Sequence, residues 1–208
     1  MANESPEGMP VWPLQGKETG TVTGYHSAAV IAEACVKKFP NLDLAKAYPA
    51  MKKRAMVDDY RSLGLYRKLG YIPADKEEES VSKTMEYVYD HWAVAHVAEA
   101  LSQAGDATLL LERSKSYRNL FEPESRFIRA RLENREWAKP FDPRGIGRSK
   151  QWRDYTEANS GRPPLRFSMT QRDTSICSAV QKPFCKNSMN CSPRVLSFPL
   201  THRRISRG

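Results

Sequence analysis

The most regular pattern of apolar and polar positions lies between Tyr71 and Gln103. Ile72 precedes Pro73, and the residue before a proline favours extended backbone, so the first positions are predicted to form a loop. From position 81 onward, apolar side chains recur every three or four residues, which is the spacing of one helix face. They are Val81, Met85, Val88 and Trp92, with Tyr89, Val97 and Ala100 on an adjoining face. The pattern predicts a long, largely buried helix that ends near Gln103.

Polar residues mark the start of this helix and part of its surface. Ser80 or Ser82 is expected to cap it, and four carboxyl-bearing residues within positions 75–79 would lie at its positive end. Glu86 and Asp90 are four residues apart and therefore share a face. Two interpretations of that pair stay open: a solvated or salt-bridged stripe, and the rim of an acidic pocket.

Three further segments show helical patterns. Residues 25–39 are apolar almost all round and end in lysines, which suit a helix C-terminus. Asp43 is expected to cap a helix over residues 44–60, in which Pro49 either introduces a kink or marks the true start. After a turn at residues 105–106, a last helix is predicted over residues 107–121. Its expected inward-facing side chains are Leu109, Leu110, Tyr117 and Leu120.

A small hairpin completes the predicted elements. Residues 126–130 indicate a strand, and residues 137–141 are its expected partner around a turn at Glu133-Asn134. The pattern as a whole predicts an all-α protein of helical hairpins with one β-hairpin. His26 is a single histidine on an apolar segment, so a core or hydrogen-bonded position is favoured over a ligand role.

Charge is distributed unevenly along the chain. Nine Lys or Arg and one acidic residue, Asp173, lie in residues 161–208, so this segment carries +8 of the formal +9 and leaves +1 for residues 1–160. The near-neutral body argues against nucleic acid as a partner. No apolar run approaches membrane-spanning length, and the first six residues do not form a signal peptide. The four cysteines fit no zinc pattern, so no metal-ligating residue is assigned.

Several stretches resemble glycoside hydrolase family 92, the calcium-dependent, exo-acting α-mannosidases. The longest is ESVSKTMEYVYD at residues 79–90, and others are WPLQGKETG at 12–20, the segments 120–129 and 140–143, and WRDYTEANS at 152–160. The resemblance covers residues 9–160. It implies a partial (α/α)6 toroid, a slice of a catalytic domain that removes terminal α-linked mannose from glycans with inversion. The family is usually secreted or periplasmic, although this chain shows no targeting signal of its own.

The resemblance also implies site residues. Glycoside hydrolysis needs a protonated carboxylic acid beside the leaving oxygen and a second carboxylate that activates water. Glu157 matches the family glutamate that acts as general acid, with Arg153 and Asp154 as supports. Trp12 and Glu18 are expected to bind substrate, although a tryptophan in a loop also suits simple packing. Calcium is implied as cofactor, but its ligands are not present in frame.

The family pattern breaks after Ser160, which divides the chain into residues 1–160 and a basic tail, 161–208. One interpretation is a disordered tail. The other is a frameshift. If each true codon begins on the last nucleotide of the codon shown, residues 160–170 permit Trp-Gln-Thr-Thr-Phe-Ala-Val-Gln-His-Asp, which is the family's continuation. Met169-Thr170 then allows only Asp at the last position. The general base and the calcium site would lie beyond this break, so the truncated chain is expected to be inactive.

The sequence thus predicts a fragment of a glycoside hydrolase whose partners are α-mannoside glycans, with no nucleic acid and no membrane. The alternative is a non-catalytic helical binding or scaffold protein whose basic tail engages nucleic acid or acidic membrane surfaces. The oligomeric state is left open.

Overall fold

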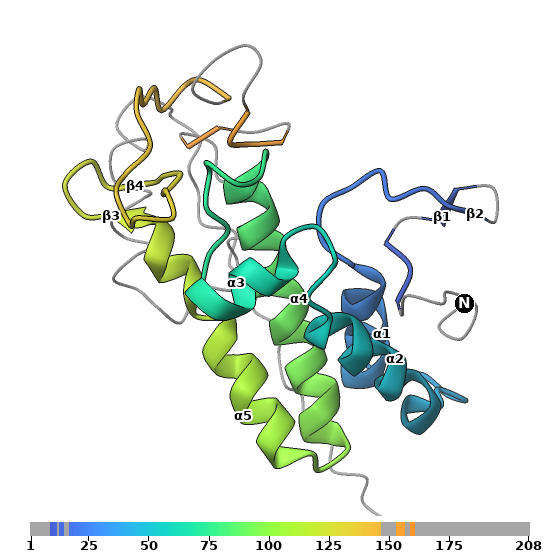
Figure 1. The fold of residues 1–208 in the computed structure, drawn as a ribbon. Helices are drawn as coiled ribbons and strands as arrows, with labels where there is room; N and C mark the ends of the chain where they lie inside the picture. The colour runs from blue at the N-terminus through green and yellow to red at the C-terminus, as the bar shows by residue number, and fades with distance from the viewer. Residues whose placement is uncertain (1–8, 12, 15–16, 147–152, 157–158, 161–208) are drawn as a thin grey trace, which may run out of the picture.

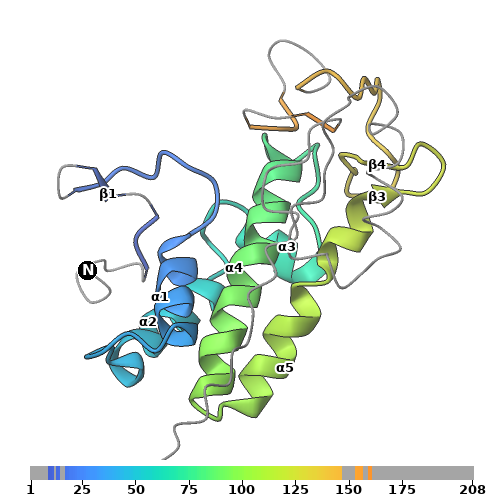
Figure 2. The ribbon, with the colours of Figure 1, turned by 180° about the vertical axis from the view of Figure 1, so that it is seen from behind.

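A single long helix runs through the middle of the molecule. The computed structural model describes residues 9–11, 13–14, 17–146, 153–156 and 159–160. Helix α4 (Ser80–Ala100) lies at its centre, α5 (Ala104–Arg113) returns beside it, and α1 (Ser27–Val36) and α2 (Leu44–Met56) pack on its other side (Figures 1 and 2). The protein is mostly helical, as predicted.

Helix α4 confirms the predicted long, buried helix but not its cap. It ends at Ala100, and Val81, Val88, Val94 and Val97 are almost completely buried. Ser80 and Ser82 lie inside the first turn instead of before it. Glu79 occupies the N-cap position with a left-handed backbone, φ 56°, and no side chain caps the helix.

A cluster of tyrosines fills the space between α4 and its neighbours. At most 1% of the surface of Tyr25, Tyr66 and Tyr87 is exposed. The ring centroids of Tyr66 and Tyr87 lie 5.8 Å apart. Such tilted aromatic pairs stabilise a core beyond the area that they bury. Tyr66 comes from α3 (Leu63–Leu69), a two-turn helix that the sequence pattern did not reveal.

The first two helices are shorter than predicted. Helix α1 ends at Val36 instead of Phe39, and Lys38 and Asn41 beyond it adopt positive φ values of 53° and 62°. Helix α2 ends at Met56 instead of residue 60. Its predicted cap is confirmed, because Asp43 accepts a hydrogen bond of 3.0 Å from the N–H of Lys46. Pro49 lies inside α2, so it does not mark the start of that helix.

The last predicted helix is two elements. Helix α5 begins at Ala104 and therefore contains the residues that were predicted to form a turn, and a 3₁₀ helix, η1 (Ser116–Leu120), follows it. Leu110, Tyr117 and Leu120 are buried as predicted. The prediction that Leu109 faces inward is wrong, since 42% of its surface is exposed. Leu109 directly precedes Leu110, and because one residue corresponds to about 100° of rotation around the helix axis, Leu109 faces away from the core when Leu110 faces into it.

Two small antiparallel sheets decorate the helices. Strand β1 (Pro13–Leu14) pairs with β2 (Lys17–Glu18), and β3 (Phe121–Glu122) pairs with β4 (Phe127–Ile128). The predicted partner of β4 was wrong: its ladder is with β3, and residues 137–141 contribute only an isolated bridge between Trp137 and Arg131. A second core cluster lies around β3 and β4. It contains Tyr71, Ala74, Val81, Leu120, Ile128, Ala130, Ala138 and Tyr155.

None of the helices in the described ranges is both long enough and apolar enough to cross a membrane.

Candidate functional site

The first turn of α4 is capped by a segment from near the other end of the described chain. The N–H of Glu79 donates to the carbonyl oxygen of Arg153 at 2.7 Å, and that of Val81 donates to Asp154 at 3.1 Å. The first N–H groups of a helix have no partner within it. Backbone carbonyls of residues 153–154 therefore take the place of the serine cap that the sequence predicted.

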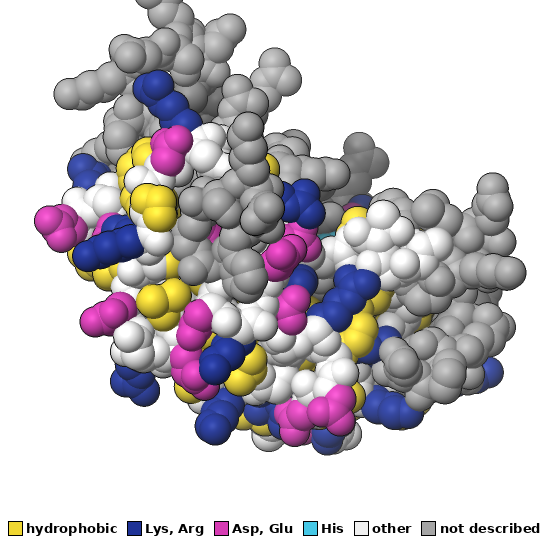
Figure 3. All heavy atoms as spheres, turned by 45° about the horizontal axis from the view of Figure 1, so that its top comes forward, with side chains coloured by type: hydrophobic (Ala, Val, Ile, Leu, Met, Phe, Trp, Pro, Cys, Tyr) yellow, Lys and Arg dark blue, Asp and Glu magenta, His cyan; other side chains and the backbone are white. Residues whose placement is uncertain are grey.

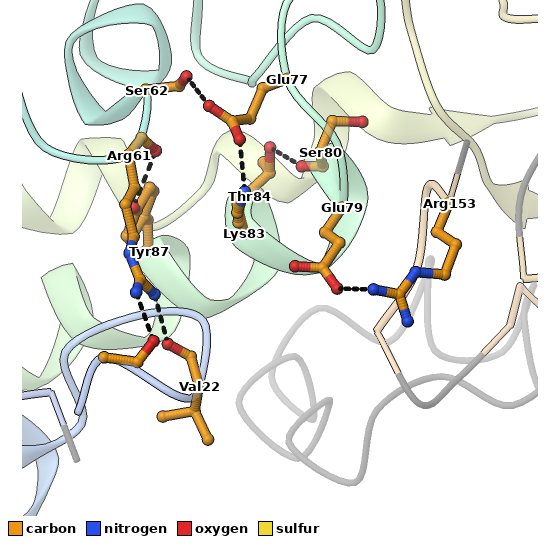
Figure 4. Close-up of polar contacts among 11 residues, drawn as sticks. Val22, Arg61, Ser62, Glu77, Glu79, Ser80, Lys83, Thr84, Tyr87 and Arg153 are labelled. Atoms are coloured by element: carbon orange, nitrogen blue, oxygen red, sulfur yellow. Dashed lines mark hydrogen bonds and ion pairs between the residues drawn. The ribbon is translucent and has the colours of Figure 1, made fainter. Parts of the chain in front are cut away.

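A serine on α4 accepts a hydrogen bond from the same segment. The hydroxyl oxygen of Ser82 accepts a hydrogen bond of 2.8 Å from the N–H of Thr156. The side chain of Arg153 also reaches α4, where Nη2 lies 3.3 Å from Oε1 of Glu79 (Figure 4). The start of α4 and residues 153–156 thus form one unit.

Strand β4 anchors the same segment from its other side. The hydroxyls of Tyr155 and Ser160 both donate to the carbonyl oxygen of Ile128, each at 2.7 Å. The amide of Asn159 donates to Arg144 at 3.1 Å. The residues immediately before and after positions 157–158 are therefore fixed on both α4 and β4.

One face of α4 connects this unit to a second cluster of polar residues. Ser82, Glu86 and Asp90 follow one another at four-residue intervals, so they share a helix face, each step rising about 6 Å. At the far end of the face lies His26. Its Nδ1 is 2.9 Å from Oδ1 of Asp90, and its Nε2 is 3.0 Å from Oε2 of Glu86. The salt-bridged interpretation of Glu86 and Asp90 is correct, and so is the hydrogen-bonded position of His26.

The geometry favours a protonated imidazole. A neutral histidine has one ring N–H, whereas here both ring nitrogens face carboxylate oxygens. Burial disfavours the charge on His26, but hydrogen bonds to Asp90 and Glu86 outweigh burial and raise its pKa from 6.5 to about 9. Burial also raises the pKa of Asp90, against the opposite effect of His26. A group charged throughout the neutral range is unsuited to proton transfer near pH 7, so this cluster positions the chain instead.

What the cluster positions is the chain entering α1. The N–H of Tyr25 donates to Oδ2 of Asp90 at 2.6 Å. Gly24 has φ +82°, and a Cβ there would lie 2.8 Å from the same carboxylate oxygen. Only glycine fits this approach. Figure 3 shows that acidic and basic side chains are interspersed over this face of the molecule.

The acidic run before α4 has a larger role than interaction with the helix dipole. Glu77 accepts a hydrogen bond of 2.6 Å from Ser62 and lies 2.6 Å from Nζ of Lys83 (Figure 4). Burial disfavours ionisation of Glu77, but Lys83 and Ser62 outweigh burial, and its pKa is lowered. Asp75 accepts from the N–H of Glu133 at 2.9 Å. The run therefore connects α4 to the chain before α3 and to the β-rich end.

The structure describes only some of the predicted site residues. Trp12 and Glu157 lie outside the described residues. Glu18 belongs to β2, where it pairs with Pro13. Sequence reasoning found the Glu86 and Asp90 pair from its spacing but missed that His26 joins it, because a contact across 60 or more residues leaves no local signal.

Calcium does not fit the acidic pair. Calcium prefers several oxygen ligands, and the two carboxylates of Glu86 and Asp90 are both directed at the protonated ring of His26, which would repel a cation. Within the part of the chain that the structure describes, no group of three or more His, Cys, Asp or Glu side chains is suited to holding a metal ion.

The family follows from comparison with known proteins. Residues 1–166 match the glycosyl hydrolase family 92 catalytic domain, and the chain belongs to this family. Among the curated proteins none matches.

Solved structures agree with this assignment. The family GH92 α-mannosidase BT3965 from Bacteroides thetaiotaomicron is 39% identical with a TM-score of 0.71, over 77% of this chain and 21% of its own. Its complex with mannoimidazole gives 40% and 0.71, over 77% and 22%. The inverting mannosidase BT2199 from B. thetaiotaomicron VPI-5482 is 28% identical with a TM-score of 0.67, over 74% and 21%. The chain thus spans about a fifth of the length of these relatives.

The bond between Ser82 and Thr156 gives a first testable prediction. Ser82→Ala should lower the free energy of unfolding by about 1–2 kcal/mol, because the N–H of Thr156 loses its acceptor. Amide hydrogen exchange at Thr156 should accelerate. Ser80→Ala is the matched control, since the Ser80 hydroxyl is buried in the same turn without a hydrogen-bond partner. Equal losses in the two variants would contradict the prediction.

Proposed function

We propose that this chain is a slice of the catalytic domain of an inverting, calcium-dependent exo-α-mannosidase, with Glu157 as general acid and α-mannoside glycans as substrates. The packing of α1, α2 and α5 around α4 supports a partial (α/α)6 toroid. The tail hypothesis, including a frameshift after Ser160, concerns residues outside the described ranges and stays a prediction.

One observation supports this proposal most directly. The chain on either side of Glu157 is fixed to two separate elements: Thr156 to α4 by Ser82, and both Tyr155 and Ser160 to β4 by Ile128. A general acid has to be held within hydrogen-bond reach of the leaving oxygen. The cluster around His26 is less suited to supply the acid, because His26 is already paired with two carboxylates. The anchoring of the residues on either side supports Glu157 in this role.

The proposed chemistry assigns a limited part to this chain. Glu157, held protonated, would donate its proton to the glycosidic oxygen as the bond to mannose breaks. A second carboxylate, about 6.5–9.5 Å away in inverting enzymes, would activate the attacking water. No residue of this chain is assigned that second role. We therefore propose that the chain binds an α-mannoside but does not turn it over.

Binding and turnover test the proposal separately. Mannoimidazole should bind the chain, and the affinity should fall about tenfold in Glu157→Gln, because an amide is no longer an acid that protonates the imidazole nitrogen. Glu124→Gln, an exposed position, is the control. No mannose should be released from an α-mannoside in the presence of calcium.

Three results would contradict these expectations. Robust release of mannose, abolished in Glu157→Gln, would disprove inactivity. Equal affinity of wild type and Glu157→Gln would remove the acid role. Absence of mannoimidazole binding to the wild-type chain would remove the support for an α-mannoside site in this slice.

A further inference from the structure

A short segment after β2, Gly20–Val22, is held by a single arginine. We call it the strap. Nη1 of Arg61 donates to the carbonyl oxygen of Val22 at 2.8 Å, and Nη2 donates to that of Gly20 (Figure 4). The planar guanidinium group matches two acceptors at once, which a lysine ammonium cannot do. Arg61 therefore fixes both ends of the strap.

Arg61 is itself held in an unfavourable backbone conformation. Arg61 and Ser62 have φ values of 42° and 61°, and consecutive left-handed residues other than glycine are strained. The carbonyl oxygen of Arg61 accepts a hydrogen bond of 3.0 Å from the hydroxyl of Tyr87 on α4, and Ser62 donates to Glu77 at 2.6 Å. Strain that neighbouring groups maintain in this way is a frequent mark of functional positions.

The strap is shaped to receive the arginine. Gly20 has φ +58°, and a Cβ on it would lie 2.5 Å from Nη2 of Arg61. Any other residue there would displace the guanidinium group. Gly20 and Arg61 thus form a complementary pair, although 41 positions separate them.

The strap lies between an expected site residue and a buried anchor. Upstream is β2, which contains Glu18, the expected substrate-binding residue. Downstream the chain is fixed to Asp90 through the N–H of Tyr25. Since Arg61 holds the stretch between them, we propose that Arg61 is a positioning residue that places the strap, and with it Glu18, for binding an α-mannoside. This inference rests on the proposed function.

Proteolysis tests whether Arg61 holds the strap. In the full chain, a Glu-specific protease should cut after Glu18 about tenfold faster in Arg61→Ala than in wild type, because cleavage follows the population of the released segment. Gly20→Ala should give the same increase with Arg61 intact, so a folding defect of one variant does not decide the outcome. Combining the two should add little, since they break the same contact. Gly105→Ala is the control, because a Cβ there meets nothing within 4 Å.

Ligand binding tests what the strap is held for. The affinity for mannoimidazole should fall about tenfold in both variants, and Arg61→Lys should recover only part of it because one ammonium cannot bridge both carbonyls. A purely structural role would accelerate cleavage and leave the affinity unchanged, which would overturn the proposal. Unchanged cleavage would overturn it as well. If wild type fails to bind mannoimidazole, the proposed function fails, and the cleavage result alone still decides whether Arg61 holds the strap.

Discussion

Replacement of Asp90 by alanine is expected to lower the free energy of unfolding by about 3–5 kcal/mol, the range for removing one partner of a buried ion pair. The Asp90 side chain is completely buried, and it accepts hydrogen bonds from the N–H of Tyr25 and from His26. Its loss leaves a buried donor and a partly uncompensated imidazolium. Urea unfolding at pH 7, followed by circular dichroism, measures the change.

Two milder variants separate the contributions. Asp90→Asn keeps an oxygen for the N–H of Tyr25 but removes the charge, so its loss should be smaller than that of alanine. Glu86→Gln removes the other carboxylate, whose side chain is 15% exposed, and should cost about 1 kcal/mol. A loss below about 1 kcal/mol in Asp90→Ala would mean that the cluster does not hold the fold together.

The prediction of α4 from sequence succeeded because its signal is local. Val81, Met85 and Val88 recur at helix spacing, and the helix exists where this period exists. The prediction of its cap failed for the opposite reason. The groups that satisfy the N–H groups of Glu79 and Val81 come from residues 153–154, and a contact over such a distance in sequence outweighs the local preference for serine.

The other errors in the fold have the same origin. Phe127 and Ile128 favour a strand whichever segment they pair with. That Phe121–Glu122 is the partner depends on where η1 ends, and the alternation of apolar and polar residues does not predict that point. Helix α3 is only two turns long, and it is stabilised by the burial of Leu63 and Tyr66 against the core, without a side-chain cap at its N-terminus. Short elements of this kind depend on tertiary packing.

The candidate site was predictable only where residues carried a family motif or a fixed spacing. The resemblance of residues 152–160 drew attention to the segment around Glu157, and the structure shows how its described neighbours are anchored. The spacing of Glu86 and Asp90 placed them on one face. Nothing in the sequence connected His26 to that pair or Arg61 to Gly20, because both contacts form only after the chain has folded.

Stability should also fall as pH rises from neutral, because His26 is charged in the folded protein. Its folded pKa of about 9 lies above the unfolded value of 6.5. Folding therefore favours the protonated form, and the stabilisation is fully present below pH 6.5 and is lost as pH rises through 9. With these values the free energy of unfolding should drop by about 2 kcal/mol between pH 7 and pH 9.

The variant His26→Gln isolates this effect, since glutamine does not titrate. The difference in unfolding free energy between wild type and His26→Gln should shrink over this pH range. His91 contributes little over this range: burial lowers its pKa to about 3 in the folded protein, and an unfolded histidine with a pKa of 6.5 is mostly neutral above pH 7. The buried tyrosines do not interfere either, because their pKa values are raised above 10. A constant difference from pH 7 to pH 9 would show that His26 is neutral between its carboxylates, and one of the two contacts would then lack a proton.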